Sequence, residues 1–201
     1  MRQLLSILIN KEEMRKKLNQ VGAKLAKKET LMKRAVFYPP EHINKNKGYL
    51  RVRDEGVGKV TMTLKIQIDG AGIETERESE IEIKSSYEEG VKFLKNLGYK
   101  QKARQESLRE IWEINNVEIM IDTWPFTETY VEIEGKSEQE VREVAEKLGF
   151  DWNKARFGAS MAPIIEEKYG ISQVEINNEI PEILFGDVNP FEEFRKKKYG
   201  K

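Results

Sequence analysis

The chain has 201 residues, and its 35 Lys and Arg residues balance 35 Asp and Glu residues, so the formal net charge is zero. A balanced charge gives no global reason to expect binding to nucleic acid or to a membrane. The chain has no cysteine and one histidine, His42, which excludes disulfides and thiol chemistry and disfavours His-based triads and metal sites. Residues 4–9, an apolar N-terminal run, are too short to span a membrane and lack the layout of a signal peptide. The sequence therefore predicts a cytoplasmic protein.

Eight segments have the pattern of β-strands. They are apolar or alternate between polar and apolar residues, and several are separated by turn signals such as Asp54-Glu55-Gly56 and Asn115-Asn116. The predicted strands are residues 4–9, 32–38, 49–54, 60–67, 74–83, 106–114, 117–123 and 130–134.

Three segments have the pattern of α-helices: residues 11–21, 87–96 and 137–147. Asn10 and Ser137 are N-cap residues, with Glu13 and Glu140 three positions on, and a glycine follows each helix. Together the elements predict an α+β fold in which about eight antiparallel strands close into a barrel, because closure removes exposed sheet edges. We expect residues 1–171 to form this domain, and residues 172–201 to form a tail packed along it or extending from it.

Charged residues occupy alternate positions of many predicted strands, and their signs are sorted by strand. Arg51, Arg53 and Lys65 are basic, whereas the segments near residues 78–82 and 118–134 are acidic. An ordinary sheet with one solvated face would explain the alternation alone. The sorting instead favours a barrel lumen with basic and acidic walls, because buried unpaired charge is costly and needs an anionic ligand and a divalent metal to neutralise it.

Seven blocks in the chain resemble, in order and spacing, consecutive motifs of the CYTH, or triphosphate-tunnel, family. The blocks are LMKRAVF (31–37), GYLRVRDEG (48–56), TMTLK (61–65), QESLREIW (105–112), IDTWP (121–125), EIEG (132–135) and KLGFDW (147–152). This family includes class IV adenylate cyclases, thiamine triphosphatases and inorganic triphosphatases. The resemblance implies a β-tunnel that binds a polyphosphate or nucleoside triphosphate together with Mg²⁺ or Mn²⁺, and metal-assisted phosphoryl or nucleotidyl transfer.

The resemblance also implies site residues, position by position. The implied phosphate ligands are Arg34, Arg51, Arg53, Lys65 and Arg109. The implied metal ligands are Glu80, Glu82, Asp122, Glu132 and Glu134. It points to a small-molecule ligand as partner, with no nucleic acid and no membrane, and it leaves a homodimer open. The three tryptophans, Trp112, Trp124 and Trp152, have apolar neighbours and are predicted to pack in the core or at its rim.

Two motifs depart from the family pattern. The Glu-x-Glu-x-Lys signature of the first strand falls on Met1, Gln3 and Leu5, or one residue later on Arg2, Leu4 and Ser6, and neither frame supplies carboxylates. The family's usual Lys-Arg pair reads Leu108-Arg109 here. Each lost charge-assisted contact weakens binding by about 1.5–3 kcal/mol. We therefore expect impaired catalysis; the alternative is a non-catalytic natural or engineered scaffold whose tunnel binds a more apolar small molecule.

Overall fold

A computed structural model describes residues 3–67, 76–152, 156–157 and 161–200, and in these residues ten strands form one sheet accompanied by six helices. The elements in chain order are β1 (Gln3–Leu8), α1 (Lys11–Gln20), β2 (Lys24–Phe37), β3 (Gly48–Asp54), β4 (Val60–Gln67), β5 (Glu76–Ile83), α2 (Tyr87–Asn96), β6 (Gln101–Ile114), β7 (Val117–Thr123), β8 (Tyr130–Gly135), α3 (Glu138–Lys147), β9 (Arg156–Phe157), α4 (Ala162–Tyr169), α5 (Gln173–Glu179), β10 (Glu182–Ile183) and α6 (Pro190–Tyr199).

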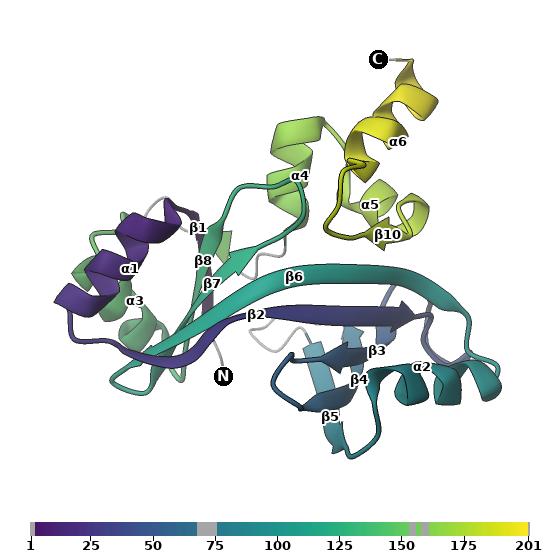
Figure 1. The fold of residues 1–201 in the computed structure, drawn as a ribbon, viewed down its shortest axis with the longest axis horizontal. Coiled ribbons are helices and arrows are strands. Elements are labelled where there is room, and N and C mark those ends of the chain that lie inside the picture. Colours follow the sequence, from purple (N-terminus) through teal and green to yellow (C-terminus); the bar gives the residue numbers. More distant parts are fainter. Residues whose placement is uncertain (1–2, 68–75, 153–155, 158–160, 201) are drawn as a thin grey trace.

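The sheet is curled and antiparallel, and its strand order is β5-β4-β3-β2-β6-β7-β8-β1-β9, with β10 added in parallel beside β6. The 14-residue strands β2 and β6 pair along their length and form the curved spine in Figure 1. Within the described residues this order has two ends, β5 and β9, so the strands form a half-barrel rather than the closed barrel that the sequence predicted. Alternation along a strand gives its faces but does not say whether the edge strands meet.

Three helices cover one face of the sheet. Helices α1 and α3 pack on β7 and β8, where Met14 and Val141 join Ile119, Ile121 and Ile133 in one buried cluster. Helix α2 packs on β2 and β3 through a second cluster. The opposite face, which we call the inner face, carries the alternate residues of the same strands, as the period of two requires.

The predicted helices are confirmed with their predicted N-caps. The side chain of Asn10 accepts a hydrogen bond from the Glu13 backbone N–H, and Ser137 forms a reciprocal capping box with Glu140. Each of these contacts satisfies a backbone donor that the first helical turn leaves without a partner. None of the helices in the described part of the chain is long and apolar enough to cross a membrane.

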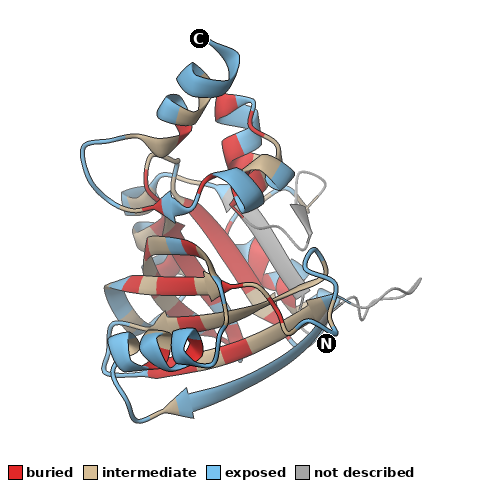
Figure 2. Cartoon of the chain, turned by 90° about the vertical axis from the view of Figure 1, so that its right-hand side faces the viewer, coloured by how far each residue is buried: buried red, intermediate tan, exposed pale blue. Residues whose placement is uncertain are grey.

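The C-terminal segment packs against one end of the inner face. Helices α4, α5 and α6 share a buried apolar cluster with Trp124 of the β7–β8 connection and Tyr130 of β8, and Phe191 of α6 is fully buried in it. In Figure 1 these helices stand above β6, and Figure 2 shows their buried sides turned towards one another and towards the sheet. The segment beyond residue 171 is therefore largely helical and contributes to the core.

Candidate functional site

The inner face is lined with charged residues brought together by strand register. Arg34 of β2 pairs across the sheet with Arg53 of β3, and Arg51 pairs with Thr63 of β4. Arg109 of β6 pairs with Asp122 of β7 in the same way. Residues directly opposite each other in antiparallel strands share a face, so all these positions lie on one surface.

Two arginines of β3 and one glutamate of β5 form the first charged group. A terminal nitrogen of Arg51 and one of Arg53 each lie 3.4 Å from a carboxylate oxygen of Glu80, which also accepts a 2.7 Å hydrogen bond from Thr63 Oγ1. Arg53 also pairs with Glu55 at 2.6 Å. The Glu80 carboxylate is partly exposed, and desolvation raises its pKa, but the hydrogen bond from Thr63 and the two guanidinium groups outweigh this, so its pKa is lowered.

Part of this group has no hydrogen-bond partner. Arg51 Nε, Arg53 Nε and Thr61 Oγ1 are buried and lack a partner within the described residues. Burial, followed by repulsion from Arg51, lowers the pKa of Arg53. Buried donors without partners are rare in folded proteins and commonly mark a place for a ligand or an ordered water.

The second charged group is one arginine held by two carboxylates. Arg109 donates to both oxygens of Asp122, at 2.7 Å from Nε and 2.6 Å from a terminal nitrogen, and that terminal nitrogen also lies 3.0 Å from Glu132. Asp122 is fully buried and Glu132 is nearly so. Burial by itself lowers the pKa of Arg109, but the two carboxylates raise it above its ordinary value. Desolvation and the charge of Asp122 raise the pKa of Glu132 to about 8.

Arg34 lies between these groups and is almost completely buried, with 6% of its surface exposed. It donates a 2.8 Å hydrogen bond to Ser107 Oγ, and its guanidinium carbon lies 4.7 Å from the centroid of the Trp124 ring. The structure gives it no carboxylate partner among the residues it describes. Desolvation, followed by repulsion from Arg109, lowers the pKa of Arg34 to about 10. We use the name arginine cluster for Arg34, Arg51 and Arg53.

The remaining predicted site residues lie on the same face but outside these groups. Lys65 and Glu134 are half-buried, and Glu82 is exposed on β5, across from Thr61. The predicted metal ligands are therefore split between β5 and the strands β7 and β8. Glu80 contacts Arg51 and Arg53, whereas Asp122 and Glu132 contact Arg109.

The described residues do not fit a metal held by the protein. They contain no group of three acidic, His or Cys side chains that could hold an ion. The backbone register of β1 pairs Leu4 with Glu134 and Ser6 with Glu132, so these positions of the second frame are in register with the predicted metal ligands of β8. Leucine and serine have no carboxylate, which is the oxygen ligand that Mg²⁺ and Mn²⁺ prefer.

Leu108 does not take the place of a phosphate ligand. Successive residues of a strand point to opposite faces, and its neighbour Arg109 is on the inner face. Leu108 pairs with Leu31 and Thr123 on the other face. The expectation that leucine at this position removes a phosphate contact is therefore wrong for this fold.

Four residues that the sequence-based prediction did not include lie beside the charged groups. Thr61, Thr63 and Ser107 provide hydroxyl groups beside the arginines, and Tyr130 lies in register with Asp122. Burial, then the charges of Asp122 and Glu132, raise the pKa of Tyr130 well above its ordinary value. Thr63 and Ser107 have a sequence signal, because each stands two positions from a predicted cationic ligand on the same strand, Lys65 and Arg109 respectively. Trp124 is buried, as predicted, but it also contacts a charged group.

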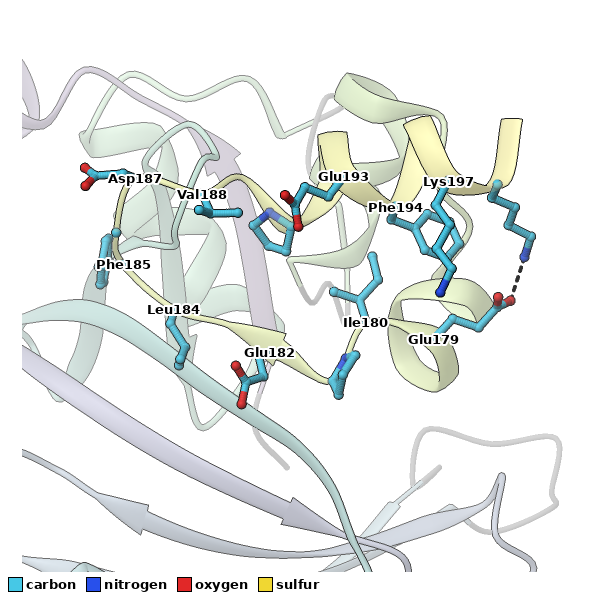
Figure 3. Close-up of a pocket in the computed structure, with 14 residues that line it drawn as sticks. Glu179, Ile180, Glu182, Leu184, Phe185, Asp187, Val188, Glu193, Phe194 and Lys197 are labelled. Atoms are coloured by element: carbon cyan, nitrogen blue, oxygen red, sulfur yellow. Dashed lines mark hydrogen bonds and ion pairs between the residues drawn. The ribbon is translucent and has the colours of Figure 1, made fainter. Parts of the chain in front are cut away.

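A groove of about 840 Å³ lies elsewhere, in the C-terminal segment between β10 and α6. Its floor includes Ile180 and Leu184, and its charged residues are exposed; Lys198 and Glu179 already form a 2.6 Å ion pair there (Figure 3). Most of the buried charges of the described residues, and the buried donors Arg51 Nε and Arg53 Nε, lie on the inner face instead. We therefore place the candidate site at the arginine cluster and the Arg109 group.

Comparison with solved structures shows related folds. A putative adenylate cyclase from Vibrio parahaemolyticus has a TM-score of 0.66 and 14% identity, covering 82% of this chain and 97% of its own. A protein from Pyrococcus horikoshii has a TM-score of 0.62 and 22% identity, covering 78% and 94%. A putative adenylyl cyclase from Hippeastrum, described as having a dominant triphosphatase activity, has a TM-score of 0.54 and 14% identity, covering 84% and 96%.

At these identities the likeness shows the fold alone. Comparison with curated proteins finds no significant match. The model of the CYTH domain matches residues 5–159, which include the arginine cluster, Arg109 and both of its carboxylate partners. The chain belongs to the CYTH family.

Proposed function

We propose that the inner face binds the phosphate chain of a small molecule, a polyphosphate or a nucleoside triphosphate, with the arginine cluster as its principal phosphate ligands. Guanidinium groups match phosphate oxygens through paired, charge-assisted hydrogen bonds. Lys65 lies on the same face and extends the basic surface along β4.

The observation that supports this most strongly is Arg34. Arg34 is 6% exposed, and its described contacts are a hydrogen bond to Ser107 and the indole ring of Trp124, with no ion pair to a carboxylate among the described residues. Burial and the repulsion from Arg109 lower the pKa of Arg34 and outweigh the charge of Asp122, which raises it. Burying one unpaired ion lowers the stability of the fold by several kcal/mol, as an order of magnitude. A bound anion would provide the missing charge, and it would also satisfy Arg51 Nε and Arg53 Nε.

An apolar ligand has less support. It would remove solvent from the arginine cluster without giving the guanidinium groups a partner, and burying polar groups without hydrogen bonds is unfavourable. The charged lining of the inner face thus favours the phosphate ligand over the more apolar alternative.

Catalysis is the second part of the proposal. The names of two structural neighbours connect this fold with adenylate cyclase and triphosphatase activities, and CYTH proteins generally depend on a divalent metal. We propose slow turnover for this chain, because in the frame that contains Leu4 and Ser6 the signature's two carboxylate positions fall on Arg2 and Leu4, and its lysine position falls on Ser6. What the residues do supply is binding and orientation: the arginine cluster holds the phosphates, and Arg109 is fixed by Asp122 and Glu132.

The test is calorimetric titration of the protein with tripolyphosphate and ATP, followed by phosphate-release assays. Arg53→Gln removes one ligand of the cluster and is expected to weaken binding about 10–100-fold, the equivalent of one or two charge-assisted hydrogen bonds. Arg142→Gln on the outer face of α3, where the arginine pairs only with Glu146 among its described ion pairs, is the matched control and should bind normally. Lack of binding by the unmodified protein at millimolar ligand would contradict the proposal.

A further inference from the structure

Two carboxylates of the inner face, Asp122 and Glu132, already contact a cation of the protein itself. Arg109 reaches both oxygens of Asp122 and one oxygen of Glu132, with all three contacts between 2.6 and 3.0 Å. Bidentate pairs of this kind are the strongest hydrogen-bonded ion pairs in proteins. The guanidinium therefore already supplies the positive charge beside Asp122 and Glu132 that a divalent ion would supply if these carboxylates held one.

Displacing Arg109 would be unfavourable for two reasons. Asp122 has no exposed surface, so losing its partner would leave a buried carboxylate that the incoming ion alone must neutralise. The guanidinium would also lose its two hydrogen bonds to Asp122, at 2.7 and 2.6 Å. Both effects hold Arg109 in place.

Strand β1, the neighbour of β8, adds no carboxylate at the positions in register with Glu132 and Glu134. In the β1–β8 register Ser6 pairs with Glu132 and Leu4 pairs with Glu134. The acidic residue of the other wall, Glu80, is held by Arg51, Arg53 and Thr63. Small hard cations need several oxygen ligands, from carboxylates, waters or phosphates. Three of the described carboxylates of this face, Glu80, Asp122 and Glu132, already contact arginines.

We propose that Arg109 replaces a protein-bound divalent metal in this chain, so that the inner face binds its phosphate ligand as the metal-free anion. The inference rests on the proposed function for the identity of the ligand. Arg109 pairs with Asp122 and Glu132, and the arginine cluster remains available to the phosphate oxygens.

The first experiment measures the dissociation constant of tripolyphosphate in EDTA and again in about 5 mM Mg²⁺. We expect apparent binding to weaken in Mg²⁺, because the ion complexes tripolyphosphate and lowers the concentration of the metal-free anion. Binding that is equally tight or tighter in Mg²⁺ would overturn the inference but leave the proposed function standing. Binding under neither condition would instead overturn the proposed function.

The second experiment titrates the ligand-free protein with Mn²⁺ and follows water-proton relaxation. The unmodified chain is expected to show no enhancement, and saturable enhancement would overturn the inference. Arg109→Gln frees the two carboxylates and is expected to gain Mn²⁺ binding, which the added change Glu132→Gln should abolish. A folded Arg109→Gln variant that gains no Mn²⁺ binding would refute the role of Arg109. If this variant does not fold, the measurements on the unmodified chain still decide.

Discussion

The guanidinium of Arg34 lies over the ring of Trp124, with 4.7 Å between the guanidinium carbon and the ring centroid. Trp124 belongs to the apolar cluster formed with α4, α5 and α6, whereas Arg34 belongs to the charged inner face. This contact therefore joins the C-terminal helices to the candidate site. A buried cation–π contact of this kind stabilises by about 2 kcal/mol or more, which offsets part of the desolvation of Arg34.

Replacing Arg34 should separate binding from stability. Arg34→Met keeps most of the side-chain volume and removes a buried charge, and such replacements are often neutral or stabilising. We expect the free energy of unfolding, measured by urea denaturation, to stay level or rise, while tripolyphosphate affinity falls about 10–100-fold. A variant that binds normally would show that Arg34 does not contact the phosphate. Arg142→Met is the control for both measurements.

The pKa of Glu132 predicts how stability depends on pH. Its ordinary value is 4.5, and burial beside Asp122 raises it to about 8 in the folded protein. Between these values the folded state holds a proton that the unfolded state has released, so the free energy of unfolding falls as pH rises from about 5 to 8. Urea denaturation at several pH values should show this decline.

Glu132→Gln is the variant that tests this assignment, because it removes the titrating group and keeps the shape of the side chain. Between about pH 5 and 8, the free energy of unfolding of this variant should fall less steeply with pH than that of the unmodified protein. Glu143→Gln on the exposed side of α3 is the control. An unchanged slope in Glu132→Gln would mean that another group causes the decline.

The packing of α6 predicts a large loss of stability from a C-terminal substitution. Phe191 is fully buried among α4, α5 and Trp124. Phe191→Ala should lower the free energy of unfolding by about 3–5 kcal/mol. Phe93→Ala on α2 is the control, since Phe93 is 57% exposed, and it should cost about 0.5 kcal/mol or less. Equal effects of the two changes would show that α6 does not contribute to the core.

Substitution of Gly56 tests the packing of the turn after β3, which contains Glu55, the ion-pair partner of Arg53. Gly56 and Gly58 both have a positive φ, at 71° and 76°. A Cβ at Gly56 would clash with the Thr30 side chain and the Leu31 carbonyl, whereas one at Gly58 would meet open space. Gly56→Ala should therefore cost more stability than Gly58→Ala, by about 1–3 kcal/mol. Thermal denaturation of the two variants measures the difference, and equal midpoints would contradict the close packing of this turn on β2.

Much of the strand and helix content followed from local patterns. All eight predicted strands and three predicted helices are present, although β2 and β6 begin earlier than predicted and residues 74–75 lie outside the described part of the chain. The C-terminal helices were not predicted, although Ser172 with Glu175 forms a capping box and Gly170 ends α4. Their amphipathic pattern is short, so packing against Trp124 and Tyr130 decides their structure more than propensity does.

The sequence by itself determined which residues share a face, because side-chain direction along a strand has a period of two. That periodicity placed Arg51, Arg53 and Lys65 on one surface. Only the tertiary structure decided which charges meet: Arg109 with Asp122 and Glu132, Glu80 with Arg51 and Arg53, and Arg34 with an indole ring. Pairing across strands depends on register and curvature, which are set by contacts between distant parts of the chain. For the same reason the sequence could not show that the predicted metal ligands are separated, and that Glu80, Asp122 and Glu132 contact arginines.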